Sequence, residues 1–262
     1  MKKLELHNIK GDYEITSIGD YVVFTGPKLF IFKADGTFVT SRQDLGIIRK
    51  SLFIDKDSIL LDCSAKSAYI LISLKDGCEK CRISQPKLDY TCSRFAASPD
   101  KRYVYDRYDL NGRYYFIRID FVTKSASKYL INNDLRCISD LVCTQQGTPV
   151  FLEQQYSEHE DNENISVSKN GTICACISDA KQKCSFQQMW QWEFPYPRIG
   201  CFFLGDEDSV LTKDLRVYKP RSGELHLLVT NEMDWKNPGI EPANYRLDTQ
   251  RQYLTLMYDT VN

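Results

Sequence analysis

The sequence is organised around a short hairpin-like segment that recurs along the chain. Each copy is a run of apolar and β-branched residues, then a tight turn, then a second run of the same kind. The copies are Lys28–Ser41, Ala68–Ile83, Tyr114–Ile131, Asn164–Ile177 and Leu215–Val229. Strands bounded by turn residues in this way predict β-hairpins, so the chain is expected to be built from one repeated β unit.

The turns of these hairpins have a common chemistry. Four of them place glycine after Asp, Asn or Ser, and such pairs tolerate the positive φ of a tight turn. They are Asp35-Gly36, Asp76-Gly77, Asn170-Gly171 and Ser222-Gly223, while the third copy has Thr123-Lys124-Ser125. Successive turns lie 41, 47, 47 and 52 residues apart. A period of about 40–50 residues made of strands is typical of propeller blades.

Two further strand-like runs precede each hairpin, which gives four strands per unit. They are Tyr13–Ile18 with Tyr21–Gly26, Ser51–Asp55 with Ser58–Cys63, Arg94–Asp100 with Arg102–Asp109, Ile138–Gln145 with Pro149–Tyr156, and Ile199–Asp206 with Ser209–Asp214. No segment of about 12 residues or more shows the 3.6-residue period of a helix. The predicted fold class is all-β.

Strand-like segments at the two ends suggest how the ring closes. Lys2–Ile9 precedes the first unit, and Tyr245–Gln250 and Gln252–Asp259 follow the fifth. Together they would form a closing blade, which removes exposed sheet edges. We therefore predict a single domain over residues 1–262, a β-propeller of six four-stranded antiparallel blades closed by N- and C-terminal strands. Seven blades is the alternative, because Lys181–Pro197 is long enough to contain more strands.

Part of the third unit resembles blades of the β-propeller superfamily, in particular its WD-repeat-like and lactonase-like members. The similarity lies in FAASPDKRYVY (Phe95–Tyr105) followed by FIRIDFVTK (Phe116–Lys124), and the repeat extends it over nearly the whole chain. No Trp-Asp dipeptide ends a unit, and the double glycine of kelch repeats is absent. The resemblance therefore implies the fold without a named subfamily, and propellers host many unrelated functions.

Charge and hydropathy exclude several classes of protein. Thirty-four basic and 35 acidic residues leave a net charge of −1, whereas a nucleic-acid-binding chain is expected to have a basic surplus. The longest apolar stretches are about six residues, against roughly 20 for a membrane-spanning helix. The first ten residues lack the apolar core of a signal peptide. We expect a cytoplasmic monomer with no cofactor, no nucleic-acid partner and no membrane association.

The residues that most often carry chemistry do not form a recognisable motif. The ten cysteines are expected to be thiols in a reducing compartment. Cys78 and Cys81 form a CxxC, but only Cys174 and Cys176 make another close pair, so no metal site is expected. The three histidines have no GxSxG nucleophile motif to serve. Most of the carboxylates weighed are interpreted as turn residues, with a catalytic pair as the alternative: Asp100, Asp106, Asp109, Asp206, Glu207 and Asp208.

Two segments depart from what a blade requires. The acidic segment, Ser157–Asn164, contains Glu158, Glu160, Asp161 and Glu163, and a local charge cluster of this kind can steer a basic partner. The aromatic segment, Gln188–Pro197, contains Trp190, Trp192, Phe194 and Tyr196, residue types enriched in binding hot spots. These eight residues are the predicted partner-binding set. The alternatives are a solvated loop and an insertion whose rings pack between the fourth and fifth units.

The function predicted from these segments is macromolecular binding. We expect a non-enzymatic β-propeller that binds a partner, a protein of basic character, through rim loops. A narrower hypothesis is a bacterial toxin-neutralising, immunity-type protein. The alternative from another class is a propeller enzyme, a hydrolase or a lactonase-like protein, that acts on a small molecule at the central funnel. An enzyme should line that funnel with converging carboxylates, histidines or a metal.

Overall fold

The computed structural model describes residues 13–86, 95–110, 113–131, 138–156, 168–194, 202–204, 206–211, 216–227, 244–247 and 254–257. In these ranges the chain forms strands joined by turns, and the one helical element is a short 3₁₀ turn, η1 (Ser64–Lys66). The all-β prediction is confirmed for the described part of the chain.

The described strands form three four-stranded sheets, one eight-stranded sheet and one two-stranded sheet. The eight-stranded sheet consists of two four-strand units, β9–β12 and β13–β16, that pair along one edge, so we describe the strands as five four-strand units followed by a pair. Unit 1 consists of β1 (Glu14–Ile18), β2 (Tyr21–Thr25), β3 (Leu29–Lys33) and β4 (Phe38–Arg42). Unit 2 consists of β5 (Lys50–Asp55), β6 (Ser58–Cys63), β7 (Ala68–Ser73) and β8 (Glu79–Ser84). Unit 3 consists of β9 (Ala96–Ala97), β10 (Tyr103–Leu110), β11 (Arg113–Asp120) and β12 (Ser125–Ile131). Unit 4 consists of β13 (Ile138–Cys143), β14 (Pro149–Tyr156), β15 (Ser168–Ser178) and β16 (Lys183–Phe194). Unit 5 is β17 (Phe202–Phe203), β18 (Val210–Leu211), β19 (Arg216–Lys219), β20 (Glu224–Leu227), and the pair is β21 (Asn244–Leu247) with β22 (Leu254–Met257).

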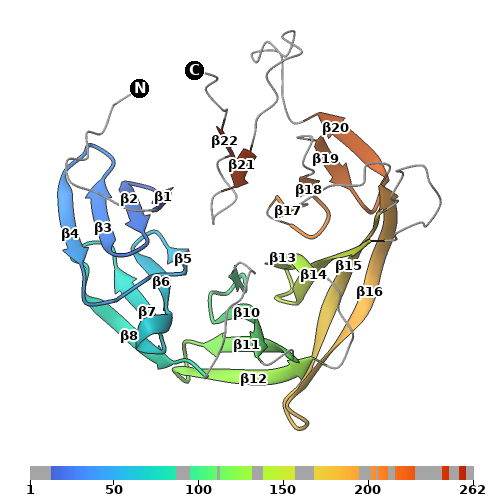
Figure 1. Ribbon diagram of the computed structural model, residues 1–262, viewed down its shortest axis with the longest axis horizontal. Coiled ribbons are helices and arrows are strands. Elements are labelled where there is room, and N and C mark those ends of the chain that lie inside the picture. Colours follow the sequence, from blue (N-terminus) through green and yellow to red (C-terminus); the bar gives the residue numbers. More distant parts are fainter. Residues whose placement is uncertain are drawn as a thin grey trace.

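The units are arranged around a ring, with the first strand of each toward the centre and the fourth at the perimeter (Figure 1). Within each unit the neighbouring strands are antiparallel. Alternate residues of a strand therefore face opposite neighbours. Phe53 of β5 shares an apolar cluster with Val23 and Ile31 of unit 1, whereas Leu52 shares one with Val104 of unit 3.

Four of the five predicted hairpin turns are confirmed. Gly36, Gly77 and Gly223 have φ values of 94°, 71° and 72°, in the left-handed region that glycine adopts without a Cβ clash. The turn without glycine places Lys124 at a φ of 52°. The hydroxyls of Thr123 and Ser125 on either side of it are hydrogen bonded at 2.7 Å.

The predicted turn at Asn170-Gly171 is wrong. Both residues lie inside β15, where Gly171 pairs with Glu153 of β14 and Gln191 of β16. A Cβ on Gly171 would lie 2.8 Å from Nε2 of Gln188, so the glycine allows a close approach by β16 and not a reversal of the chain. The chain reverses at residues 179–182 instead, where Gln182 has a φ of 49°.

The stretch that left room for a seventh blade is a single strand up to Phe194. Lys183–Phe194 forms β16, which pairs along its whole length with β15, so it is the fourth strand of unit 4 and not an insertion. Met189 is the extra residue at a register shift opposite Thr172 and Ile173. Residues 195–200 lie outside the described residues.

Closure of the ring stays a prediction, and so does the number of blades. β21 and β22 lie in the sector between unit 5 and unit 1 (Figure 1), while Lys2–Ile9 lies outside the described residues. Unit 1 turns a largely aromatic face away from unit 2, with Ile15, Phe24, Phe30, Phe32 and Phe38 in register across its strands. Ile15 and Phe38 are 59% and 54% exposed, so this face retains apolar surface for a closing sheet to cover.

Units 3 and 4 are joined by strand pairing as well as by apolar packing. The end of β12 pairs in parallel with the start of β16, through Leu130 with Lys183 and Ile131 with Cys184. Asp179, in the turn before β16, accepts hydrogen bonds from the Tyr129 hydroxyl at 2.6 Å and the Arg118 guanidinium at 2.7 Å. These two donors lower the pKa of Asp179, which keeps the carboxylate charged. We call this contact the outer clamp.

Gly77 and Gly223 have nearly the same φ but different surroundings, so they test whether the β7–β8 turn packs against unit 1. A Cβ on Gly77 would clash with the Thr40 side chain of unit 1, whereas a Cβ on Gly223 meets nothing within 4 Å. Gly223→Ala should cost about 1–2 kcal/mol from the left-handed backbone alone. Gly77→Ala should cost on the order of 1–3 kcal/mol more, because it overpacks a junction. The free energy of unfolding of both variants is measured with urea. Equal losses would contradict the contact between the β7–β8 turn and Thr40 of unit 1.

Candidate functional site

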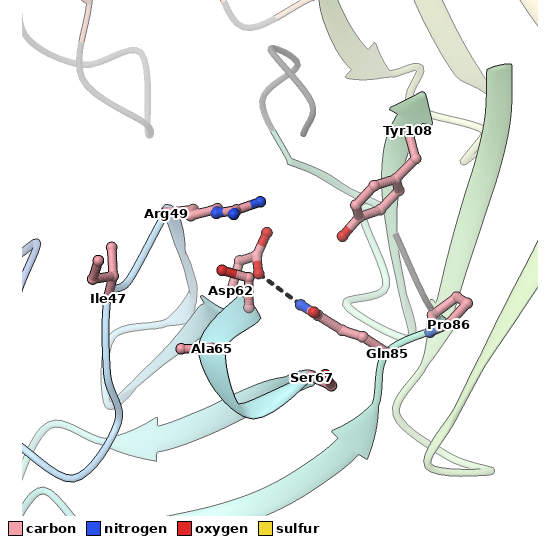
Figure 2. A pocket seen from close by; sticks show the side chains of 9 residues that line it. Ile47, Arg49, Asp62, Ala65, Ser67, Gln85, Pro86 and Tyr108 are labelled. Carbon is pink, nitrogen blue, oxygen red and sulfur yellow. Dashed lines mark hydrogen bonds between the residues drawn. The ribbon is translucent and has the colours of Figure 1, made fainter. Parts of the chain in front are cut away.

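A pocket of about 230 Å³ lies between units 2 and 3 (Figure 2). Four separate stretches of chain line it: the approach to β5, the end of β6 with the η1 turn and Ser67, the segment after β8, and β10. The lining residues are Ile47, Arg49, Asp62, Ser64, Ala65, Ser67, Gln85, Pro86 and Tyr108. Because successive strands run in opposite directions, the starts of first strands and the second-to-third connections share one face of the ring. We call it the pocket face.

The pocket has a buried polar floor and an exposed mouth. Asp62 and Tyr108 are 2% and 3% exposed, whereas Ile47 at the mouth is 62% exposed. Gln85 donates from Nε2 to Oδ1 of Asp62 at 2.6 Å, and the Arg49 backbone N–H donates to the Asp62 carbonyl at 3.0 Å. Figure 2 shows the Arg49 guanidinium, the Asp62 carboxylate and the Tyr108 hydroxyl directed toward the same space. Hydrogen bonds thus hold much of the lining in place before any ligand binds.

A buried ion pair lies beside this floor. Nζ of Lys50 is 2.6 and 2.7 Å from the two carboxylate oxygens of Asp106, which is fully buried. The ammonium also lies 5.3 Å from the ring centroids of Phe95 and Tyr108. Burial raises the pKa of Asp106, and the Lys50 charge partly offsets that effect. The pair connects β5 of unit 2 to β10 of unit 3.

Two tyrosines extend this polar contact. The hydroxyls of Tyr69 and Tyr108 share a hydrogen bond of 2.5 Å across the junction. Burial raises the pKa of both phenols well above the ordinary value, so both stay protonated at neutral pH. Lys50, Asp62 and Tyr69 occupy one register row across β5, β6 and β7, which brings their side chains to the same face of unit 2.

The structure describes part of the predicted partner-binding set. Glu158, Glu160, Asp161, Glu163 and Tyr196 lie outside the described residues. Trp192 and Phe194 are on β16, in register with Asn170 and Ser168.

Trp190 is the member of the set whose side chain is described. It is partly buried and packs against the apolar cluster between units 4 and 5 together with Met189 and Tyr218. The Arg221 guanidinium lies 4.7 Å from its ring centroid. Trp190 therefore has a packing role at this junction, whatever it does in binding.

The other residues weighed in the sequence occupy ordinary structural positions where they are described. His226 is on β20, opposite Val217. Asp100 and Asp206 accept backbone hydrogen bonds within turns, as expected. Asp106 does not lie at a turn: it is inside β10, where its charge is compensated by Lys50.

The cysteines of the described residues are all free thiols: Cys63, Cys78, Cys81, Cys143, Cys174, Cys176 and Cys184. Burial raises the pKa of Cys63, Cys143 and Cys184 to about 12, so these three are neutral and weakly reactive. Within the described ranges, no three His, Cys, Asp or Glu side chains converge as metal ligands would.

The pocket residues were not predicted from the sequence. One available signal is a charged residue inside an apolar strand: Asp62 is the fifth residue of SILLDC, and Asp106 interrupts YVYDRYD. Buried carboxylates require a partner, so each of them implies a compensating group nearby. Lys50 could not be identified as the group that compensates Asp106 without knowing how the sheets of units 2 and 3 pack together.

The ion pair makes a pH-dependent prediction. Lys50→Met leaves the Asp106 carboxylate buried without its cation, which should cost about 3–5 kcal/mol of unfolding free energy at pH 7. Loss of the ammonium raises the pKa of Asp106 further. Because this pKa is higher in the folded than in the unfolded chain, protonation of Asp106 at low pH favours the folded state. The loss of unfolding free energy caused by Lys50→Met should therefore shrink as the pH falls toward 5.

The matched control is Arg102→Gln, which breaks the exposed Arg102–Asp120 pair at 3.3 Å and should cost less than about 1 kcal/mol. Urea unfolding at pH 7 and pH 5 measures both variants. A Lys50→Met loss as small as the control, or one that does not change with pH, would be inconsistent with a buried charge pair.

Comparisons with known proteins support the fold and identify no family. No protein-family model matches the chain, and no curated protein matches it in sequence. Within the described part of the chain there is no helix long and apolar enough to cross a membrane.

Two solved structures are similar in fold. Hydrazine synthase from Kuenenia stuttgartiensis matches with 12% identity over 77% of this chain and 62% of its own, at a TM-score of 0.54. TolB from Acinetobacter baumannii matches with 16% identity over 82% of this chain and 55% of its own, at a TM-score of 0.50. The chain therefore spans less than two thirds of the length of either. With antiparallel units of four strands arranged around a ring, this chain has the β-propeller fold that its repeat resembles.

Proposed function

We propose that this β-propeller is a binding protein that recognises a protein partner of basic character through its pocket face. The observation that carries the proposal is the register of unit 4. Tyr156 at the end of β14 pairs with Ser168 at the start of β15, and Ser168 pairs with Phe194 at the end of β16. The acidic segment connects the first two of these residues, and the aromatic segment runs through the third.

The described residues next to the two segments support this proposal, because Tyr156 and Ser168, which flank the acidic segment in the sequence, and Phe194 of the aromatic segment lie at one end of one sheet. By the alternation of strand direction, the β14–β15 connection is the counterpart in unit 4 of the β6–β7 connection that lines the pocket in unit 2. Charged groups supply long-range attraction, and aromatic side chains supply contact area once partners meet. Segments of both kinds at one sheet end are what a binding surface requires.

The chemistry of the described titratable groups supports binding over nucleophilic catalysis. Burial raises the pKa of the Tyr69 and Tyr108 phenols and of three thiols, which keeps these groups protonated at neutral pH. The buried carboxylate of Asp106 is held by Lys50. Groups in this state stabilise the fold and are poor nucleophiles or bases.

The acidic segment can be tested by charge neutralisation. A variant with Glu158→Gln, Glu160→Gln, Asp161→Asn and Glu163→Gln should associate on the order of tenfold more slowly at low salt, with a flatter salt dependence, because exposed charges act on encounter. The partner is recovered by affinity purification from extracts of the source cells, identified, and then measured in purified form by surface plasmon resonance.

The matched control removes four charges from turns on the opposite face: Asp20→Asn, Asp35→Asn, Asp57→Asn and Asp76→Asn. Asparagine keeps the side-chain oxygen that accepts backbone hydrogen bonds at Asp35 and Asp76, so the turns are retained. This control should bind like the parent. Equal slowing in both variants would show a general charge effect and would exclude the acidic segment as the steering surface.

The aromatic segment makes a separate prediction about dissociation. Trp192→Ala should speed dissociation by about 30-fold, equivalent to about 2 kcal/mol, if the indole contacts the partner. Trp190→Ala removes a ring that packs between units 4 and 5, so it should also lower the free energy of unfolding by about 2 kcal/mol. A Trp192→Ala protein with unchanged dissociation would contradict a binding role for that residue.

A further inference from the structure

Two thiols lie side by side on the face of unit 4 that is turned toward unit 5. Cys174 and Cys176 are two residues apart on β15, and alternate residues of a strand point to the same face. Cys174 is partly buried and packs against the apolar cluster between units 4 and 5, whereas Cys176 is exposed. Free cysteine is among the most buried residue types, so a pair of thiols that solvent can reach is an unusual feature of a strand.

The two thiols interact with each other. Burial raises the pKa of the Cys174 thiol, and the neighbouring Cys176 thiol raises it further. Cys184 of β16 is buried in the cluster between units 3 and 4, on the opposite face of the sheet. In the described part of the chain, no group of three or more Cys, His, Asp or Glu side chains is placed to hold a metal ion. The pair is therefore a set of two sulfur donors.

The spacing of the pair suits a bridging ion better than a direct bond between the sulfur atoms. Two residues of a strand advance about 6.6 Å, and parallel side chains keep their Cβ atoms about that far apart. A disulfide needs Cβ atoms about 3.5–4.5 Å apart, so it would require a movement of the backbone. A bond between zinc and a thiolate is about 2.3 Å long, so two sulfur atoms on either side of one ion lie about 4.6 Å apart. Side chains that lean toward each other reach that separation.

The residues beside the pair favour one kind of ion. Ser185 and Gln187 of β16 lie opposite Cys176 and Cys174, and their side chains offer neutral oxygen atoms, which are hard donors. Zinc takes four ligands in a tetrahedron, so two thiols do not complete a zinc site. Cu(I) is a soft ion that selects sulfur ligands, and it is stable with two thiolates.

We infer that Cys174 and Cys176 bind one Cu(I) ion between their sulfur atoms. Each thiol loses its proton to solvent and each sulfur forms one bond to the ion, so one Cu(I) replaces two protons and no electron is transferred. The exposed Cys176 gives the ion access from solvent. The site uses neither the acidic segment nor the tryptophans, so it does not depend on the proposed protein partner.

Anaerobic competition for Cu(I) tests this site in the full chain, with the coloured chelator bicinchoninate as the competitor. The double variant Cys174→Ser with Cys176→Ser should withdraw one equivalent of Cu(I) fewer from the chelator than the parent does. This difference is unaffected by copper that other cysteines hold in both proteins. Equal uptake by the two proteins would overturn the proposal.

The matched control is Cys78→Ser with Cys81→Ser, which removes the CxxC pair. Cys78 lies in the connection between β7 and β8, and Cys81 packs against the cluster between units 2 and 3. This variant should take up as much Cu(I) as the parent. A loss in this control together with full uptake by the β15 variant would place the copper at the CxxC and overturn the assignment.

Two further measurements separate a site of two sulfur atoms from a larger one. X-ray absorption at the copper edge, with one equivalent of Cu(I) bound, should show two sulfur neighbours. Zn²⁺ should be held no more tightly by the parent than by the double variant of β15, because two ligands do not satisfy its tetrahedral preference. Three or four ligands at copper, or tightly held zinc that is lost with the two serines, would overturn the two-ligand assignment.

Thermal unfolding establishes that each variant is folded. Cys176→Ser alone alters an exposed side chain, which contributes little to folding, so it decides the proposal if the double variant does not fold. With one thiolate left, this variant should also lose the equivalent of Cu(I). A folded Cys176→Ser protein with the uptake of the parent would show that the pair is not the site.

Discussion

The ring depends on apolar contact between the faces of neighbouring sheets. In β6, Ile59 and Leu61 belong to the cluster shared with unit 1, whereas Leu60 between them belongs to the cluster shared with unit 3. One strand thus supplies two cores, which is why the sequence of unit 2 is apolar in runs and not in alternation. A four-stranded sheet with two apolar faces must be covered on both sides, and neighbouring units on the ring cover both faces of unit 2.

The junction between units 2 and 3 combines this apolar packing with charge. Lys50, Asp106 and the Tyr69–Tyr108 hydroxyl pair are buried among apolar side chains and bond to one another across the junction. Removing the partner of a buried charge is costly, so such a network favours one alignment of the two sheets over displaced ones. The pocket opens beside this network, where Arg49 and Asp62 continue the polar lining to the surface. Tyr108 belongs both to the network that aligns the two sheets and to the lining of the pocket.

Local features of the sequence were sufficient to predict most of the strands. The turns at Gly36, Gly77, Lys124 and Gly223 follow from residue types that accept a positive φ, and the flanking runs follow from β propensity. Asn170-Gly171 failed because the same dipeptide can also serve a close approach between strands, and only the neighbouring Gln188 distinguishes the two cases. The β12–β16 pairing could not be predicted, since it depends on where two perimeter strands meet.

The candidate site was beyond local prediction for a similar reason. Lys50 and Asp106 are separated by 56 residues, and Tyr69 and Tyr108 by 39, so their contacts depend on the register of each sheet and on how neighbouring sheets pack. The acidic segment and the whole aromatic segment were predicted to depart from strand composition, but Gln188–Phe194 of the aromatic segment forms part of β16. That Tyr156, Ser168 and Phe194 lie together at one end of unit 4 follows only from the ladder that joins these three residues.

The outer clamp gives the ring an uneven stiffness. Sliding unit 3 against unit 4 would break the backbone pairing of β12 with β16 and pull Asp179 away from Arg118 and Tyr129. No other two units are joined by strand pairing in the described part of the ring, and apolar side chains resist shear less than hydrogen-bonded strands do. Relative motion should therefore be smaller between units 3 and 4 than at a junction held by side chains alone, even one with a polar network such as that beside the pocket. A molecule bound in the pocket would add contacts across the junction of units 2 and 3. It would thereby reduce the motion of units 1 and 2 relative to the rigid pair formed by units 3 and 4.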